Sequence, residues 1–162
     1  MLIVLGVVMH YIYPWTNESL LVAIFVPVNE SVWEHLKLGY WSLIIYSIVE
    51  YTVVGRDMNN YLPAKGLGIS ILTLTILVIF YSYTGILGTN ILAIDIGSYV
   101  LGAFLCQIIS YRLFTSKPVG RGMYLFFTLI LLVFGLCLAI WTFNPPHFPI
   151  FMDQNTGQFG ID

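Results

Sequence analysis

The sequence predicts an all-α integral membrane protein, a single domain of about five transmembrane helices. Two observations support this prediction. Hydrophobic residues make up 59% of the 162 residues and charged residues only 9%, whereas soluble domains carry about 25% charged residues. The mean hydropathy of +0.89 agrees. Most of the surface is therefore expected to face the lipid bilayer of a cell membrane. The net charge of −2 gives no reason to expect a nucleic-acid partner.

Five apolar stretches are the expected spans. They are residues 1–14, 32–54, 66–87, 90–113 and 123–143. The last four reach the length of about 20 residues that a spanning helix needs, and helices are expected because backbone groups in hydrocarbon must be paired. The first is short, and it lacks both the basic start and the cleavage site of a signal peptide. Residues 20–28 form a shorter apolar segment, expected at the interface or re-entrant, and residues 144–162 form a Pro-rich, polar tail.

Positive charge predicts the orientation. In the five-span arrangement the loops at residues 55–65 and 115–122 share one side of the membrane. At or beside these loops lie five of the six basic residues: Arg56, Lys65, Arg112, Lys117 and Arg121. Basic loops stay in the cytoplasm, so the amino terminus is expected inside and the carboxyl terminus outside.

The same orientation gathers most other ionisable groups on the outer side. All three histidines and six of the eight acids are expected there: His10, Glu18, Glu30, Glu34, His35, Asp95, His147, Asp153 and Asp162. Any chemistry is therefore expected at the outer end of the bundle.

The densest polar segment runs from Pro27 to Lys37, directly before and into the second span. Glu30 and Glu34 are four residues apart, which places them on one helix face. Two carboxylates beside the imidazole of His35 predict either a site for a divalent metal such as zinc or a proton relay. Asn29, Ser31 and Lys37 would complete this polar pocket.

A purely structural interpretation competes for the two acids. Ser31 and Glu34 have the spacing of a capping box, in which the glutamate only starts a helix. Glu30 would suit the positive end of the same helix dipole. Neither of these roles at the start of a helix explains why His35 and Lys37 lie at membrane depth.

Other polar residues are candidates for the same pocket. His10, near the outer end of the first span, and His147, in the stiff Pro-rich tail, are possible metal ligands alongside Glu34 and His35. The tail would fold back as a lid that also carries Asp153, or extend freely. Asp95 lies within the fourth span, where an acid is costly and usually functional. With Glu30 it is a candidate to activate water.

The segment Pro27–Lys37, together with the tail motifs at residues 145–153 and 156–161, resembles an uncharacterised bacterial family of small multi-pass membrane proteins, classed as a domain of unknown function. The resemblance covers the whole length. It implies the same multi-pass fold and marks the same polar segments, but it implies no activity.

Three classes of function remain open at this stage. The first is a metal-dependent membrane enzyme acting on a lipid-type substrate. The second is an ion- or proton-coupled transporter, although inverted repeats are absent from the sequence. The third is a non-catalytic accessory subunit, working as a homo-oligomer or with a larger membrane partner. The sequence contains no motif that names a chemistry, so whether the protein is an enzyme stays undecided.

Overall fold

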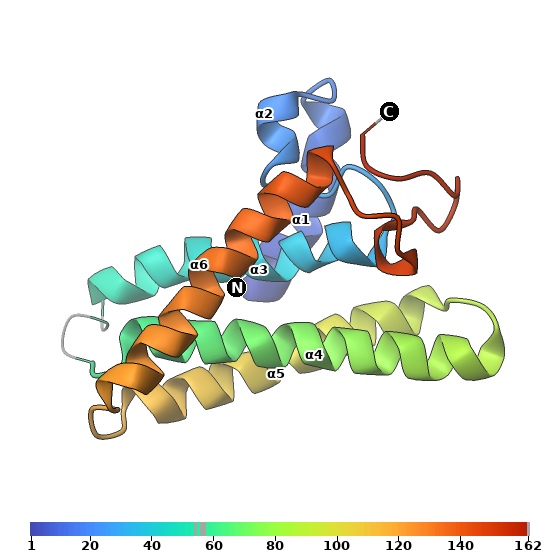
Figure 1. Cartoon of the computed structure of the whole chain (residues 1–162). Coiled ribbons are helices and arrows are strands. Elements are labelled where there is room, and N and C mark those ends of the chain that lie inside the picture. The colour runs from blue at the N-terminus through green and yellow to red at the C-terminus, as the bar shows by residue number, and fades with distance from the viewer. Residues whose placement is uncertain (54, 56–57, 162) are drawn as a thin grey trace. The chain divides into compact units, whose positions relative to one another are not determined.

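The computed structural model describes residues 1–53, 55 and 58–161 and is all-α within them. Six α-helices follow one another in these residues: α1 (Leu2–Trp15), α2 (Leu20–Ala23), α3 (Val32–Val53), α4 (Tyr61–Leu87), α5 (Leu92–Phe114) and α6 (Arg121–Phe143) (Figure 1). A single 3-10 turn, η2 (Pro149–Phe151), interrupts the tail. The expected span end at Val54, and the charges of Arg56, Asp57 and Asp162, lie outside the described residues.

Within the part of the chain that the structure describes, three helices, α4, α5 and α6, are long and apolar enough to cross a membrane. The other two expected spans differ. The 14 residues of α1 are apolar but short, since a span needs about 20 residues. The 22 residues of α3 have the length, but Glu34 and Lys37 in its first two turns and Glu50 near its end make it more polar. The structure therefore supports three of the five expected spans by length and composition.

The start of α4 differs from the expected span, which began at residue 66. The helix begins at Tyr61, with Pro63 inside its first turn. Proline is tolerated there because the first N–H groups of a helix have no partner within it. At the other end, Gly88 closes α4 in the left-handed conformation, with φ 72°.

Contacts divide the chain into two compact units, and the division falls within α3 and within α6. The first unit comprises residues 1–46 and 132–162, and the second comprises residues 47–131. Each is described by itself below.

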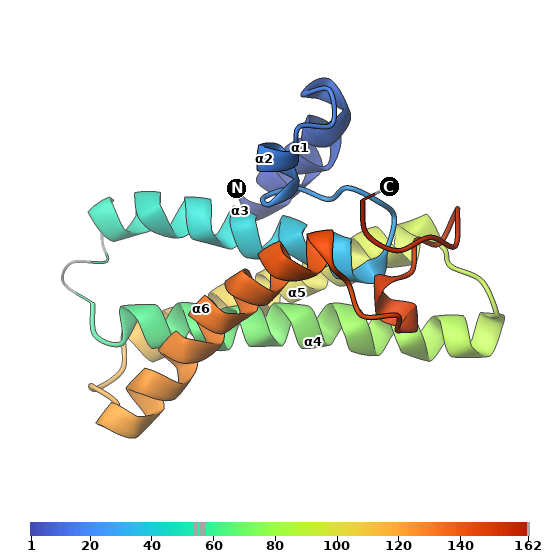
Figure 2. The same ribbon diagram turned by 45° about the horizontal axis from the view of Figure 1, so that its top comes forward.

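In the second unit, α4 and α5 lie side by side as an antiparallel hairpin (Figures 1 and 2). Small residues line the contact. A Cβ built on Gly68 would come within 2.4 Å of Ser110 Oγ, and one on Gly102 would come within 3.1 Å of the Leu72 carbonyl oxygen. The Ser110 hydroxyl also donates to the carbonyl of Ala64 at 3.0 Å. Close approach through small residues is the usual way that helices pack in a membrane.

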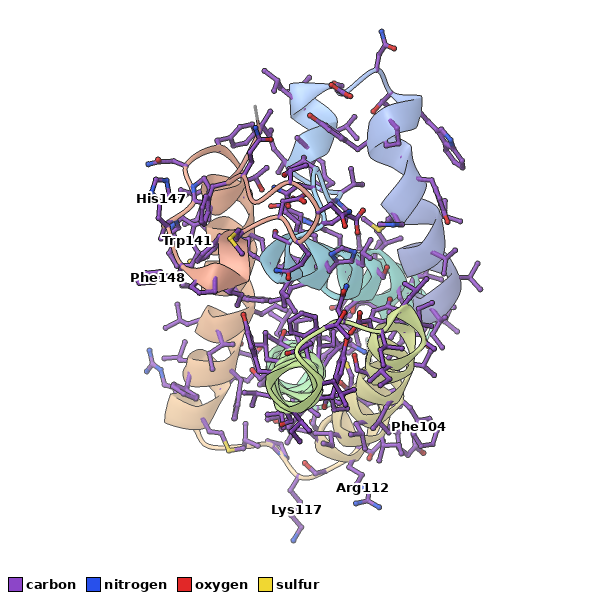
Figure 3. All side chains as sticks on the ribbon, turned by 90° about the vertical axis from the view of Figure 1, so that its right-hand side faces the viewer. Phe104, Arg112, Lys117, Trp141, His147 and Phe148 are labelled. Atoms are coloured by element: carbon purple, nitrogen blue, oxygen red, sulfur yellow. The ribbon has the colours of Figure 1, made fainter. Side chains whose placement is uncertain are left out.

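A side chain joins the two loops that lie together at one end of this hairpin. At one end, Asn60 bonds the loop that follows α5: its amide nitrogen donates to the carbonyls of Leu113 and Lys117, and its oxygen accepts the N–H of Val119 at 2.8 Å. The loop before α4 and the loop after α5 therefore lie at the same end of the unit, as the five-span arrangement requires. Figure 3 shows the side chains of Arg112 and Lys117 projecting away from the ribbon.

A buried ion pair lies in the same unit and was not expected from the sequence. The ammonium of Lys65, 1% exposed, pairs with the carboxylate of Glu50, 11% exposed. The Tyr61 hydroxyl donates to the same carboxylate at 3.0 Å. Lys65 had been interpreted as a loop charge; because α4 starts early, it lies inside the helix.

In the first unit, α1, α2 and the start of α3 enclose an apolar cluster. Its buried members are Met9, Tyr13, Ala23 and Val26. The tail after α6 returns to this unit, and Ile161 packs against the same cluster. In Figures 1 and 2 the red tail runs beside the light-blue segment that leads into α3.

Candidate functional site

Three of the predicted residues converge in the first unit. They are His10 on α1, Glu30 in the segment before α3, and His35 in the first turn of α3. One donor atom from each lies within 4.8 Å of the other two. Across residues 1–53, 55 and 58–161, this is the one group of three such side chains close enough to share a metal ion. We call it the His10–Glu30–His35 cluster.

The ring of His35 is oriented by a backbone carbonyl. Its Nδ1 lies 2.9 Å from the carbonyl oxygen of Ser31, and a carbonyl can only accept, so Nδ1 carries the proton. In the neutral ring, Nε2 then carries a lone pair and no proton. This nitrogen lies 3.4 Å from Glu30 Oε2. Two acceptors facing each other require a cation between them, either a proton on Nε2 or a metal ion. A metal-binding histidine usually donates its other nitrogen to a carbonyl in this way.

His10 lies near the other oxygen of the same carboxylate. Its Nε2 lies 3.9 Å from Glu30 Oε1, and the ring centroids of His10 and His35 are 5.3 Å apart. Two ligands at about 2.0 Å from a tetrahedral zinc ion lie about 3.3 Å apart. The His35–Glu30 separation already fits that value, and His10 would have to move inward.

Exposure and charge at Glu30 suit a cation. The side chains of the three residues are between 32% and 46% exposed, so the cluster opens to its surroundings on one side. When His35 is protonated, its hydrogen bond to Glu30 and the positive charges of His35 and His10 hold the pKa of Glu30 below its usual range, against the opposing effect of burial. Glu30 is therefore ionised at neutral pH.

Glu34, which the sequence placed among the metal ligands, has both oxygens engaged elsewhere. Oε2 accepts the ammonium of Lys37 at 2.6 Å and the N–H of Val28 at 3.1 Å. Oε1 accepts the hydroxyl of Thr142 at 3.1 Å. Lys37, fully buried, also donates to the carbonyls of Ala23 and Val26, at 2.7 and 3.3 Å. The pair thus ties the start of α3 to the end of α2 and to α6.

The capping box is present on one side only. The Ser31 hydroxyl accepts the N–H of Glu34 at 3.2 Å, but the N–H of Ser31 is taken by the side-chain oxygen of Asn29 at 3.0 Å. The side chain of Glu34 is thereby free to pair with Lys37. Asn29 and Ser31 act here on the backbone of the segment before α3.

Asp153 joins the tail to this segment. Its Oδ2 accepts the N–H of Glu30 at 2.8 Å, and its Oδ1 accepts the N–H groups of Asn155 and Thr156 at 2.7 and 2.8 Å. Burial alone would raise the pKa of Asp153, but these N–H donors outweigh it and lower the pKa. The tail therefore folds back onto this segment, which is one of the two arrangements expected for it.

The two remaining candidates lie outside the cluster. The ring of His147 packs on Phe159, with centroids 4.7 Å apart, and Figure 3 shows His147 and Phe148 on the outer side of the tail. Asp95 belongs to the second unit, where its carboxylate accepts the hydroxyl of Tyr83. The same Tyr83 oxygen accepts the N–H of Ile91 at 3.0 Å, so Asp95 and Tyr83 close the turn between α4 and α5.

Sequence reasoning missed Thr142 and Glu50. Thr142 is 0% exposed near the end of an apolar helix, and a hydroxyl alone among apolar residues was a weak signal. Glu50 could have been paired with Lys65 only if the early start of α4 had been recognised.

Residues 1–161 of the 162-residue chain match one family model, described as a family of unknown function. Among curated proteins and among solved structures no match to the chain is found. The chain belongs to this family of unknown function, DUF6512.

Proposed function

We propose that this protein is a multi-pass membrane protein that binds a divalent metal ion, most suitably zinc, through His10, Glu30 and His35. The observation that carries the proposal is the facing pair of acceptors, His35 Nε2 and Glu30 Oε2, 3.4 Å apart. In the neutral ring, donation from Nδ1 to the Ser31 carbonyl leaves Nε2 with the lone pair that a metal ion needs.

The ligand set favours a reactive site over a purely structural one. Two histidines and one glutamate, with a fourth position open, are the ligands of several hydrolytic zinc sites, whereas structural zinc sites are closed by four protein ligands. A metal bound here would lower the pKa of a coordinated water and polarise an ester or phosphate oxygen. The partial exposure of all three side chains leaves room for that water.

The chain itself supplies ligand orientation. The Ser31 carbonyl holds His35, and the buried Glu34–Lys37 pair holds the first turns of α3, from which His35 projects. We place this site at the outer surface, with a lipid-type molecule as substrate, because the lipid-facing helices would deliver such a substrate laterally. This proposal does not need Glu34 or His147 as metal ligands. It also does not need Asp95 to activate water, and it assigns Glu30 to the metal instead of to that role.

Five spans with the carboxyl terminus outside complete the proposal, in which α1 and α3 cross the membrane as well as α4, α5 and α6. The shared end of the loops at Asn60 and Val119 supports this arrangement. Alkaline phosphatase, active only outside the cytoplasm, would be fused after residue 161 or after residue 118. Activity of the first fusion alone is expected; activity of the second alone would reverse the orientation.

Metal binding is tested directly on protein purified in detergent without chelator. Elemental mass spectrometry should find about one metal ion per chain in the wild type, and none in His35→Ala or Glu30→Gln. His147→Ala is the matched control, because its ring packs on Phe159, and it should keep the metal. A folded wild type that takes up no metal even after zinc is added would contradict the proposal and favour an accessory or proton-coupled role.

A further inference from the structure

The tail is hydrogen-bonded to the segment that carries Glu30. Asp153 is 6% exposed, and its two oxygens serve different purposes. One oxygen accepts N–H groups of the tail's own turn, those of Asn155 and Thr156, and the other accepts the backbone N–H of Glu30. A single buried carboxylate therefore links the tail turn to the backbone of a cluster residue.

Two further contacts fix the tail in this position. The Asn29 side chain donates to the carbonyl of Gly160 at 3.0 Å. The buried ring of Phe151 packs against Trp33 and Trp141, with centroids 4.8 and 5.5 Å away. The tail is thus docked through polar contacts and through an aromatic anchor.

Glu30 depends on this docking more than the two histidines do. His10 and His35 project from helices, whose backbones are fixed by their own hydrogen bonds. Glu30 lies in the bend before α3, and its N–H is held by Asp153 from a position 123 residues away. Loss of the tail would leave the backbone of Glu30 without that restraint.

We propose that Asp153 is a positioning residue for Glu30, so that docking of the tail and binding of a metal at the His10–Glu30–His35 cluster strengthen each other. This inference rests on the metal site proposed above. Groups that orient metal ligands typically contribute 10–100-fold to metal affinity. A metal ion would also offset the repulsion between the neighbouring carboxylates of Glu30 and Asp153. Because such coupling is reciprocal, the metal should stabilise the docked tail as much as the tail stabilises the metal.

Cobalt(II) provides the test, because its visible absorption reports the coordination geometry. Wild type, Asp153→Asn and Gln154→Ala would be titrated with cobalt(II) in detergent. Circular dichroism during unfolding would check that each variant is folded. In Asp153→Asn an NH₂ group replaces one of the two acceptor oxygens and must face a backbone N–H. We expect about 10–100-fold weaker cobalt binding and an altered spectrum. Gln154, exposed on the same tail and bonded only to the Met152 carbonyl among described partners, should leave both unchanged on replacement by Ala.

Hydrogen exchange of the wild type gives a second measurement that does not depend on the folding of Asp153→Asn. Cobalt should slow exchange in residues 153–158, and the effect should be absent in His35→Ala. Unchanged affinity and spectrum in a folded Asp153→Asn, or no effect of cobalt on tail exchange, would overturn the positioning role while leaving the metal site intact. No cobalt binding by the wild type would instead overturn the metal site itself.

Discussion

The ammonium of Lys37 donates to the carboxylate of Glu34 at 2.6 Å, with side chains 0% and 3% exposed. The remaining donors of Lys37 reach the carbonyls of Ala23 and Val26. Both charges are thus paired and hydrogen-bonded within the first unit, which is the condition under which buried charges are tolerated.

Replacing Lys37 by Met should strongly destabilise the protein, because the Glu34 carboxylate would remain buried without its partner. Breaking such a pair costs about 3–5 kcal/mol. Thermal unfolding in detergent would measure the loss. The double variant with Glu34→Gln should recover part of it, whereas Lys117→Met, at an exposed cation, should change little. A single variant as stable as the wild type would show that the pair contributes nothing.

Asn60 should be needed to hold the two basic loops together. Asn60→Ala removes the acceptor of the Val119 N–H and the donor to the Leu113 and Lys117 carbonyls. We expect a loss of about 1–3 kcal/mol in the free energy of unfolding and faster hydrogen exchange in residues 115–119. Asn59→Ala is the control, since that side chain is exposed and, among the described residues, makes one hydrogen bond of 3.3 Å, to the Ser116 carbonyl. Equal effects of the two variants would argue against a specific role for Asn60.

Gly66 should tolerate no side chain. A Cβ there would lie 1.9 Å from the carbonyl oxygen of Phe127, a backbone atom of α6, so Gly66→Ala must push α4 and α6 apart. Overpacking of this kind costs about 1–3 kcal/mol, measured as a lower unfolding temperature. Gly85, in the same helix with nothing within 4 Å of its Cβ position, should accept alanine with unchanged or slightly higher stability. Similar behaviour of both variants would contradict the close approach.

Acid should release the tail. The pKa of Asp153 and that of Glu30 are both lowered in the folded protein. A lowered pKa contributes stability that is full above the unfolded pKa and is lost as the pH falls through the folded pKa. Docking should therefore persist at neutral pH, begin to weaken below about pH 3.9, the ordinary value of an aspartate, and fail as the pH falls through the lower pKa of the folded protein. Tryptophan fluorescence would follow it, because Trp33 and Trp141 contact Phe151. A transition near neutral pH, or the same one in Asp153→Asn, would point to other groups.

Much of the helical layout was predictable, because long apolar runs specify helices by length alone. The polar segment before α3 was also visible as a local cluster. The contacts that the residues of this segment make could not be predicted from the sequence. The sequence grouped Glu34 with the metal ligands, although Lys37, three residues on, lay within reach on the same helix face. The bond between Asp153 and Glu30 joins positions 123 residues apart and leaves no local pattern. The meeting of His10 and His35 likewise depends on how two helices pack.

The central claim is that His10, Glu30 and His35 bind one metal ion, and X-ray absorption at the zinc K-edge of the zinc-loaded protein tests it most directly. We predict two histidine nitrogens and additional oxygen ligands at about 2.0–2.1 Å, with one histidine lost from the spectrum of His10→Ala. A zinc environment without histidine, or one that is unchanged in His10→Ala and His35→Ala, would contradict the claim.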